Sequence, residues 1–265
     1  MRAVVTGASG AVGTALVDYL KHKKITVIRW NRGEVPIDAY YPMEDFLRAV
    51  RPDILFHLAI ASKNTGRENE NWLVNYEWPS ELAWITRILN IAFVFTSSVA
   101  VFSDHAQGPF TLDAKPDASE GYGNEKRMAE QRVFFQNPQA RIARLGWQIG
   151  DAPGSNNMVD YLHKKMAENG EIRASTKWLP SCSMLADTAR ALFQIAQKQP
   201  GLYQVNANDR WNFYEIAVAL NEIHGNPWKV TPVENFVYDQ RMIDKHVKIP
   251  PLEKRLKTLA SPANL

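Results

Sequence analysis

The sequence has one cysteine, no long apolar run and almost no net charge. Cys182 is that single cysteine among 265 residues, so the chain cannot form an internal disulfide, and a reducing, cytoplasmic location is expected. The longest mainly apolar runs, 54–61 and 91–95, are far shorter than the ~20 residues that cross a membrane. Lysine and arginine number 31 against 28 acidic residues, so no nucleic-acid partner is expected.

The N-terminus is not expected to act as a secretion signal. Arg2 precedes an apolar stretch, but Gly7, Gly10 and Gly13 interrupt that stretch. Hydrophobic residues make up 45% of the chain, which is typical of a globular protein, and the length fits one large domain or one domain with a small lobe. The six histidines show no pairing at metal-ligand spacing, so no metal is expected.

The first 150 residues alternate between strand-like and helix-like patterns. Strands are expected at 2–6, 25–30, 35–38, 54–59, 92–97 and 141–145, and helices at 11–21, 43–50, 71–89 and 121–135. Continuous apolar strands separated by helices are typical of a parallel sheet covered on both faces. The pattern therefore predicts an α/β fold, with a Rossmann-type doubly wound parallel sheet over residues 1–150.

The pattern changes after Gly150. A polar loop at 151–157 is followed by expected helices at 158–169 and 187–198 and expected strands at 171–174 and 202–205. We expect residues 151–265 to form mainly a small C-terminal lobe, with about 184–206 returning to the first domain.

A glycine loop joins the first strand to the first helix. In Thr6–Gly13, Gly7 and Gly10 allow a tight turn and close approach of the backbone to a pyrophosphate, and Gly13 lets the helix pack on the strand. The helix N-terminus offers free N–H groups to the phosphates. The loop predicts a dinucleotide site formed by Gly7, Ser9, Gly10, Ala11, Val12 and Gly13; the alternative is a structural turn without a ligand.

The end of the second strand indicates which dinucleotide is preferred. A site selective for NAD has a carboxylate there, whereas this chain has Arg29, Asn31 and Arg32, with no acid before Glu34. Arginines suit a 2′-phosphate because they bind it through charge-assisted hydrogen bonds. We therefore expect Asn31 and Arg32 to favour NADP(H); NAD(H) remains possible if the arginines are only solvated.

Tyr122 and Lys126 lie one helical turn apart, so both side chains face the same side of a helix. A lysine ammonium is expected to lower the pKa of the tyrosine and prepare it to exchange a proton with a carbonyl oxygen. Tyr19 with Lys23 and Tyr161 with Lys165 have the same spacing and are expected at the surface. The first pair differs because Thr96-Ser97-Ser98 ends an apolar strand upstream, at the sheet edge where ligands bind.

Together these segments resemble the extended short-chain dehydrogenase/reductases. The resemblance covers about residues 1–205 and is carried by 6–13, 52–59, Asn75, 98–102, 122–126 and 144–147. Within this epimerase/dehydratase-like superfamily, the chain is most similar to the dTDP-4-dehydrorhamnose reductase group. Arg144 with Trp147, the segment 154–158 and Pro180 before 187–189 carry that closer likeness.

The resemblance implies a catalytic set of Ser98, Tyr122 and Lys126, with Ser98 preferred to Ser97. It also implies further cofactor contacts, listed by position as Asp38 near the adenine, Leu58, Ala59 and Ile60 in the cleft, Asn75, and Lys126 on the nicotinamide ribose. The substrate candidates in the second lobe are Trp147, Asn157, Trp178 and Arg210. An aromatic ring can stack on a sugar or a base.

The expected reaction is NADPH-dependent reduction of a carbonyl of a nucleotide-linked keto-sugar, of the 4-keto-6-deoxy type, by a monomer or homodimer. Three places depart from the group's pattern: Val99 and Ala100 after Ser98, Glu125 in place of a serine before Lys126, and 246–256. The alternatives are an NAD-dependent sugar-nucleotide epimerase or dehydratase and a non-catalytic NADP-binding regulatory protein on the same fold.

Three kinds of residue are expected to be structural. His57 follows a strand and is expected to line the core or the cleft wall, and Cys182 is expected in a polar turn as an unreactive thiol. Trp72, Trp78 and Trp84 recur at near-helical spacing, which favours core or dimer contacts.

Overall fold

The central feature of the fold is a parallel sheet of six strands. A computed structural model describes residues 1–62 and 65–259. The strand order is β10-β5-β4-β3-β1-β2 and all pairs are parallel. The strands are β1 (Arg2–Thr6), β2 (Thr26–Arg29), β3 (Ile54–His57), β4 (Ala92–Ser98), β5 (Arg141–Leu145) and β10 (Gly201–Val205). This order confirms the predicted Rossmann-type fold class.

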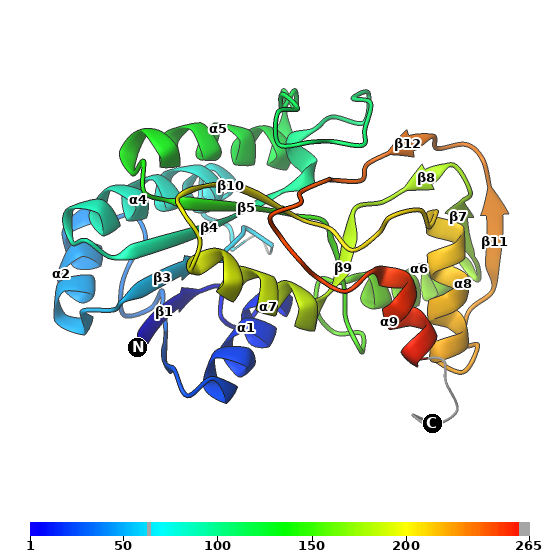
Figure 1. Ribbon diagram of the computed structural model, residues 1–265, viewed down its shortest axis with the longest axis horizontal. Helices are drawn as coiled ribbons and strands as arrows, with labels where there is room; N and C mark the ends of the chain where they lie inside the picture. The colour runs from blue at the N-terminus through cyan, green and yellow to red at the C-terminus, as the bar shows by residue number, and fades with distance from the viewer. Residues whose placement is uncertain (63–64, 260–265) are drawn as a thin grey trace.

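Helices cover both faces of the sheet (Figure 1). One face carries α1 (Ala11–His22) and α7 (Leu185–Ala196), and the other carries α2 (Tyr40–Val50), α4 (Trp78–Ile88) and α5 (Gly121–Gln136). The residues of β3 alternate between the two cores, with Leu55 in one and Ile54 and Phe56 in the other. Burial on both faces explains why the strand reads as an uninterrupted apolar run.

Two predictions for the first 150 residues are wrong in detail. Residues 35–38 form no strand; they fold as a loop whose Val35 and Ile37 are buried in the core, and the Trp30 indole donates to the Val35 carbonyl at 3.1 Å. The apolar residues of this loop serve burial, so they mimic a strand pattern. The expected helix at 71–89 is divided into α3 (Glu70–Trp72), a π-helical turn (Leu73–Glu77) and α4.

The division of that helix follows from Pro79. Proline has no N–H to donate to the carbonyl of the residue four positions earlier, here Asn75, and the wide turn lies directly before it. Such π turns often occur at functional sites. Of the three tryptophans in this region, Trp78 is buried, Trp72 stacks on Tyr76, and Trp84 is partly exposed.

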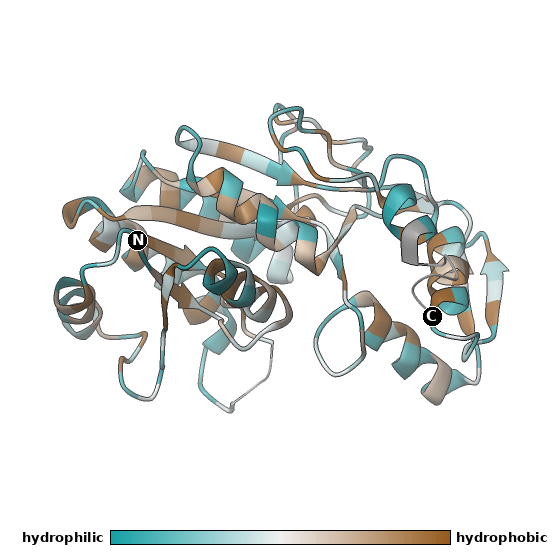
Figure 2. Cartoon of the chain, turned by 60° about the horizontal axis from the view of Figure 1, so that its bottom comes forward, coloured by the Kyte–Doolittle hydropathy of each residue, from teal (hydrophilic) through white to brown (hydrophobic). Residues whose placement is uncertain are grey.

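The second lobe gathers at one end of the molecule (Figures 1 and 2). It contains three short parallel strand pairs, β6 (Trp147–Ile149) with β9 (Cys182–Met184), β7 (Ile172–Ser175) with β11 (Val230–Val233), and β8 (Trp178–Leu179) with β12 (Tyr238–Asp239). Helices α6 (Met158–Asn169), α8 (Phe213–Ile223) and α9 (Leu252–Leu259) pack around them. Between β9 and α8 the chain returns to the main sheet through α7 and β10.

The setting of Cys182 differs from the prediction. It lies in β9 and is fully buried among apolar residues, not in a polar turn, because its strand pairs with β6 in the core of the lobe. Burial raises the pKa of its thiol. In residues 1–62 and 65–259 no helix is long and apolar enough to cross a membrane.

Candidate active site

The glycine loop is shaped by close backbone contacts. Gly7 has φ +63°, and a Cβ there would lie 2.8 Å from the Ala59 nitrogen. A Cβ on Gly13 would lie 2.0 Å from the Gly7 carbonyl oxygen. Gly10 is the N-cap of α1 and provides no side-chain cap, so the first N–H groups of the helix stay available to an anion. The loop therefore fits the pyrophosphate of a dinucleotide.

The ends of β1 and β3 are held together beside this loop. The Thr6 hydroxyl accepts hydrogen bonds from the backbone nitrogens of Leu58 (3.1 Å) and Ala59 (3.3 Å) and lies 3.1 Å from His57 Nδ1. His57 is fully buried against Trp78. Burial, and then the charge of Lys126, lower the pKa of His57 well below its ordinary value. A neutral His57 thus fixes the segment that faces Gly7.

The structure brings Ser98, Tyr122 and Lys126 together. Ser98 ends β4, and its hydroxyl accepts from the Ala100 nitrogen at 3.1 Å and forms a hydrogen bond with the Tyr122 side chain. Tyr122 lies in the first turn of α5, and Lys126 one turn later donates from Nζ to the Thr96 carbonyl at 3.0 Å. The neighbouring Ser97 is buried instead. A proton donor and a second hydroxyl thus face the carboxyl end of β4.

The pKa of Tyr122 differs from the prediction. Burial of its hydroxyl raises its pKa to about 12, the Ser98 hydrogen bond lowers it, and Glu125 raises it, although 38% of the residue is exposed. Lys126 does not produce the expected lowering. Its Nζ lies 5.9 Å from the Tyr122 ring centre, and burial lowers the pKa of Lys126 itself to about 7, which weakens its charge near neutrality.

A buried ion pair lies behind Lys126. Arg144 donates two hydrogen bonds to the Glu130 carboxylate, at 2.9 and 2.7 Å, and its guanidinium packs over Phe102. Glu130 is one turn beyond Lys126 on α5, and its charge raises the lysine pKa against the larger effect of burial. Through the charge of Glu130, the pair therefore affects the pKa of the candidate catalytic lysine.

Asn75 lies in the π-helical turn and links two parts of the site. Its Oδ1 accepts from the Ala61 nitrogen at 3.2 Å, and its Nδ2 donates to Glu125 at 2.8 Å. The side chain connects the loop after β3 to α5. Its partner on α5, Glu125, stands at the position where the resemblance leads one to expect a serine.

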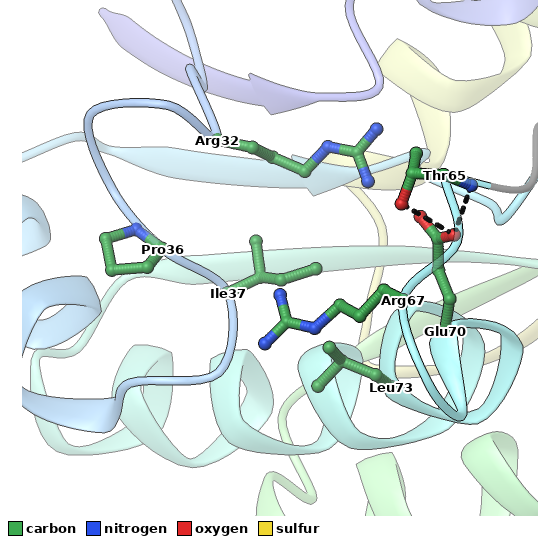
Figure 3. A pocket seen from close by; sticks show the side chains of 7 residues that line it. All are labelled: Arg32, Pro36, Ile37, Thr65, Arg67, Glu70 and Leu73. Carbon is green, nitrogen blue, oxygen red and sulfur yellow. Dashed lines mark hydrogen bonds between the residues drawn. The ribbon is translucent and has the colours of Figure 1, made fainter.

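A pocket of about 200 Å³ lies beyond the glycine loop, at the expected adenosine end of the cofactor (Figure 3). It is lined by Arg32, Pro36, Ile37, Thr65, Arg67, Glu70 and Leu73. Arg67 pairs with Asp38, and Glu70 accepts hydrogen bonds from the Thr65 nitrogen and hydroxyl. Asn31 instead shapes its own turn through hydrogen bonds with Gly33 and Glu34.

Arg67, Thr65 and Glu70 are not among the residues expected from the sequence. The available signal was their place in the loop that follows β3, a strand whose carboxyl end is next to the glycine loop. Ile60 lies in the same segment, directly after Leu58 and Ala59.

The substrate candidates divide into two groups. Trp147 and Trp178 stack with ring centres 5.7 Å apart, and Phe213 and Tyr161 pack on Trp147. Tyr161 is exposed, as expected, and its ring also contributes to this aromatic cluster.

The other two substrate candidates are engaged within the protein. Asn157 is buried and caps α6 through Val159 and Asp160, so its place speaks against a substrate contact. Arg210 is exposed and pairs with Glu253 at 2.9 Å. Across the described ranges no group of three or more histidine, cysteine or acidic side chains is arranged to hold a metal.

Comparison with known families gives one match over most of the chain. The family described as RmlD substrate binding domain matches residues 1–242. The spore coat polysaccharide biosynthesis protein SpsK of Bacillus subtilis is 25% identical over 227 residues, 84% of this chain and 80% of that protein. The dTDP-4-dehydrorhamnose reductase of Streptomyces griseus is 29% identical over 172 residues, 63% of this chain and 56% of that protein.

Solved structures share the fold. A dTDP-4-dehydrorhamnose reductase from Clostridium acetobutylicum has a TM-score of 0.83 at 21% identity, covering 97% of both chains. The Bacillus anthracis reductase in complex with NADP has a TM-score of 0.82 at 19% identity, covering 97% of this chain and 98% of that one. A UDP-glucose 4-epimerase with UDP-glucose from Thermotoga maritima has a TM-score of 0.80 at 18% identity, covering 98% and 96%.

Proposed function

Because the chain belongs to the RmlD substrate binding domain family, we propose that it reduces the carbonyl group of a nucleotide-linked 4-keto-6-deoxy sugar with NADPH. The family membership confirms the resemblance to the dTDP-4-dehydrorhamnose reductase group and an NAD(P)-dependent reductase of the extended short-chain dehydrogenase type. The choice of NADPH and of this sugar class is our proposal. The observation that supports carbonyl reduction is the meeting of Ser98, Tyr122 and Lys126 at the end of β4.

In this mechanism the Ser98 hydroxyl donates a hydrogen bond to the substrate carbonyl oxygen, and Tyr122 donates the proton. A Tyr122 pKa of about 12 keeps the phenol protonated at neutral pH, so it acts as an acid. When bound, the nicotinamide would supply the hydride. Lys126 lies one helical turn from Tyr122, with Nζ 5.9 Å from the Tyr122 ring centre, and the N–H groups that it does not use on Thr96 suit a ribose hydroxyl.

The aromatic cluster of the second lobe supports a nucleotide-linked substrate. Trp147 and Trp178 are half-buried, so part of each indole ring stays accessible. An accessible indole face suits stacking on a base or a sugar. The two indoles would therefore hold the nucleotide or sugar while Ser98 and Tyr122 act on the carbonyl.

The alternative is an NAD-dependent epimerase or dehydratase. The observation that favours it is the presence of two carboxylates, Asp38 and Glu70, at the adenosine pocket, because carboxylates accept hydrogen bonds from ribose hydroxyls. Arg32 and Arg67 beside them favour a 2′-phosphate. Val99 next to Ser98 also leaves no additional acid for dehydration.

Replacement of Tyr122 by phenylalanine tests the proposal. Removing the general acid should lower kcat for NADPH oxidation with a nucleotide-linked keto-sugar by about 10²- to 10⁴-fold. NADPH affinity, measured by tryptophan fluorescence, should stay within about twofold because the change removes one neutral hydroxyl. Tyr19→Phe is the matched control, since Tyr19 also precedes a lysine by four residues but packs on Phe193. Normal turnover by Tyr122→Phe would exclude this mechanism.

A further inference from the structure

We propose that Arg67 binds the 2′-phosphate of the cofactor together with Arg32, and that Asp38 holds the Arg67 guanidinium until that phosphate arrives. The inference rests on the proposed NADPH preference. It adds a ligand from the segment after β3 to the arginine expected after β2, and it gives the Asp38–Arg67 ion pair a role in binding.

The two arginines reach the pocket from different strands. Arg32 follows β2 and Arg67 follows β3, and these strands flank β1, which leads into the glycine loop. Figure 3 shows the two side chains extending into the pocket from opposite sides, above Leu73. A phosphate between them would sit beside the adenosine end of a dinucleotide whose pyrophosphate lies on Gly7–Gly13.

The two carboxylates near the arginines differ in how firmly they are held. Glu70 is buried and accepts hydrogen bonds from the backbone nitrogen and the hydroxyl of Thr65, at 2.8 and 2.9 Å. These bonds, and less strongly the charges of Arg32 and Arg67, hold the pKa of Glu70 below its ordinary value. Glu70 is thus a fixed, ionised part of the pocket wall.

Asp38 is the exchangeable acid. Its side chain is 43% exposed and forms an ion pair with Arg67, whose own side chain is 45% exposed. A phosphate dianion carries more charge than one carboxylate and offers three oxygens to a guanidinium fork. Asp38 can turn to solvent when the phosphate takes its place, so exchange at Arg67 requires no buried group to move.

Binding of adenosine 2′,5′-bisphosphate and of adenosine 5′-monophosphate to the full chain isolates this end of the cofactor from catalysis. Isothermal titration calorimetry would compare wild type with Arg67→Gln, Arg32→Gln, Asp38→Asn and the Asp38→Asn/Arg67→Gln double variant. Arg48→Gln is the control, because Arg48 is also exposed and paired with an acid, Glu44, but lies on α2 outside the pocket lining.

Arg67→Gln should lower the affinity for the bisphosphate about tenfold to a hundredfold, the effect of losing a charged hydrogen-bond partner. Its affinity for the monophosphate should change by less than about twofold. Asp38→Asn should raise the affinity for the bisphosphate, because Arg67 no longer has a competing carboxylate. The double variant should remain weak. Arg48→Gln should bind both nucleotides as wild type does.

Recovery of wild-type bisphosphate affinity in the double variant would overturn the inference, because Arg67 would then only shield Asp38. Wild-type affinity in Arg67→Gln would overturn it as well. If Arg32→Gln alone loses the preference for the bisphosphate, the NADPH proposal stands without Arg67. If wild type shows no preference for the bisphosphate over the monophosphate, the NADPH preference and the inference both fail.

Discussion

Burial of the Lys126 ammonium should make the stability of the free protein depend on pH. Lys126 is fully buried, its Nζ donates a hydrogen bond to the Thr96 carbonyl, and burial lowers its pKa to about 7. The unfolded chain keeps a lysine pKa of about 10.4. Between these values the unfolded state binds more protons than the folded state, so the unfolding free energy rises with pH.

The size of the effect follows from the two pKa values. The full difference corresponds to about 4 to 5 kcal/mol, with a slope of up to roughly 1.4 kcal/mol per pH unit. Between pH 6 and pH 9, where folded proteins are easily handled, the gain should be about 2.5 kcal/mol. The contribution unfavourable to folding is complete below pH 7 and disappears above about pH 10.4.

Urea unfolding of wild type and Lys126→Met across this range is the assay. The unfolding free energy of wild type minus that of Lys126→Met should rise with pH, because methionine cannot titrate. Lys21→Met is the control, since it removes the same charged group from an exposed position at the end of α1. Parallel pH profiles for wild type and Lys126→Met would refute the reasoning that burial lowers the pKa of Lys126 to about 7.

Two further substitutions test the surroundings of the site. Gly13→Ala places a Cβ 2.0 Å from the Gly7 carbonyl oxygen, so it should lower the unfolding free energy by about 1–3 kcal/mol and weaken NADPH binding in fluorescence titrations; Asp18→Ala, at an exposed position of the same helix, should do neither. Glu130→Gln leaves the Arg144 guanidinium buried without its counter-charge and should cost about 3–5 kcal/mol in urea unfolding. Glu168→Gln, which breaks the exposed pair with Lys165, should cost less than about 1 kcal/mol; equal losses for the two glutamates would contradict the burial argument.

The parts of the fold that depend on local periodicity were predictable. β1, α1, β5 and α6 begin within a residue of their expected positions because apolar spacing, the glycine loop and the loop before Met158 mark them. The error at 35–38 has a different cause. Val35 and Ile37 are buried by a loop that folds back on the core, and periodicity alone cannot distinguish a buried loop from a strand.

The candidate site was predictable where one motif places several residues. Tyr122 and Lys126 share a helix face, and Ser98 ends the neighbouring strand, so their meeting follows from topology. Arg67 and Glu70 could not be found this way because a polar segment has no period, and its position over the pocket depends on how the chain leaves β3. The Tyr122 pKa was also beyond sequence reasoning, since it depends on how deeply the hydroxyl and Lys126 are buried.

The most direct test of NADPH-dependent reduction follows the transferred hydrogen. The protein would be incubated with NADPH carrying deuterium at the transferable position and with a nucleotide-linked 4-keto-6-deoxy sugar, and the product would be analysed by mass spectrometry. The account predicts a reduced sugar that retains the deuterium, with one NADP⁺ formed for each product molecule. Conversion of the sugar without net oxidation of NADPH, or a reduced sugar without deuterium, would contradict it.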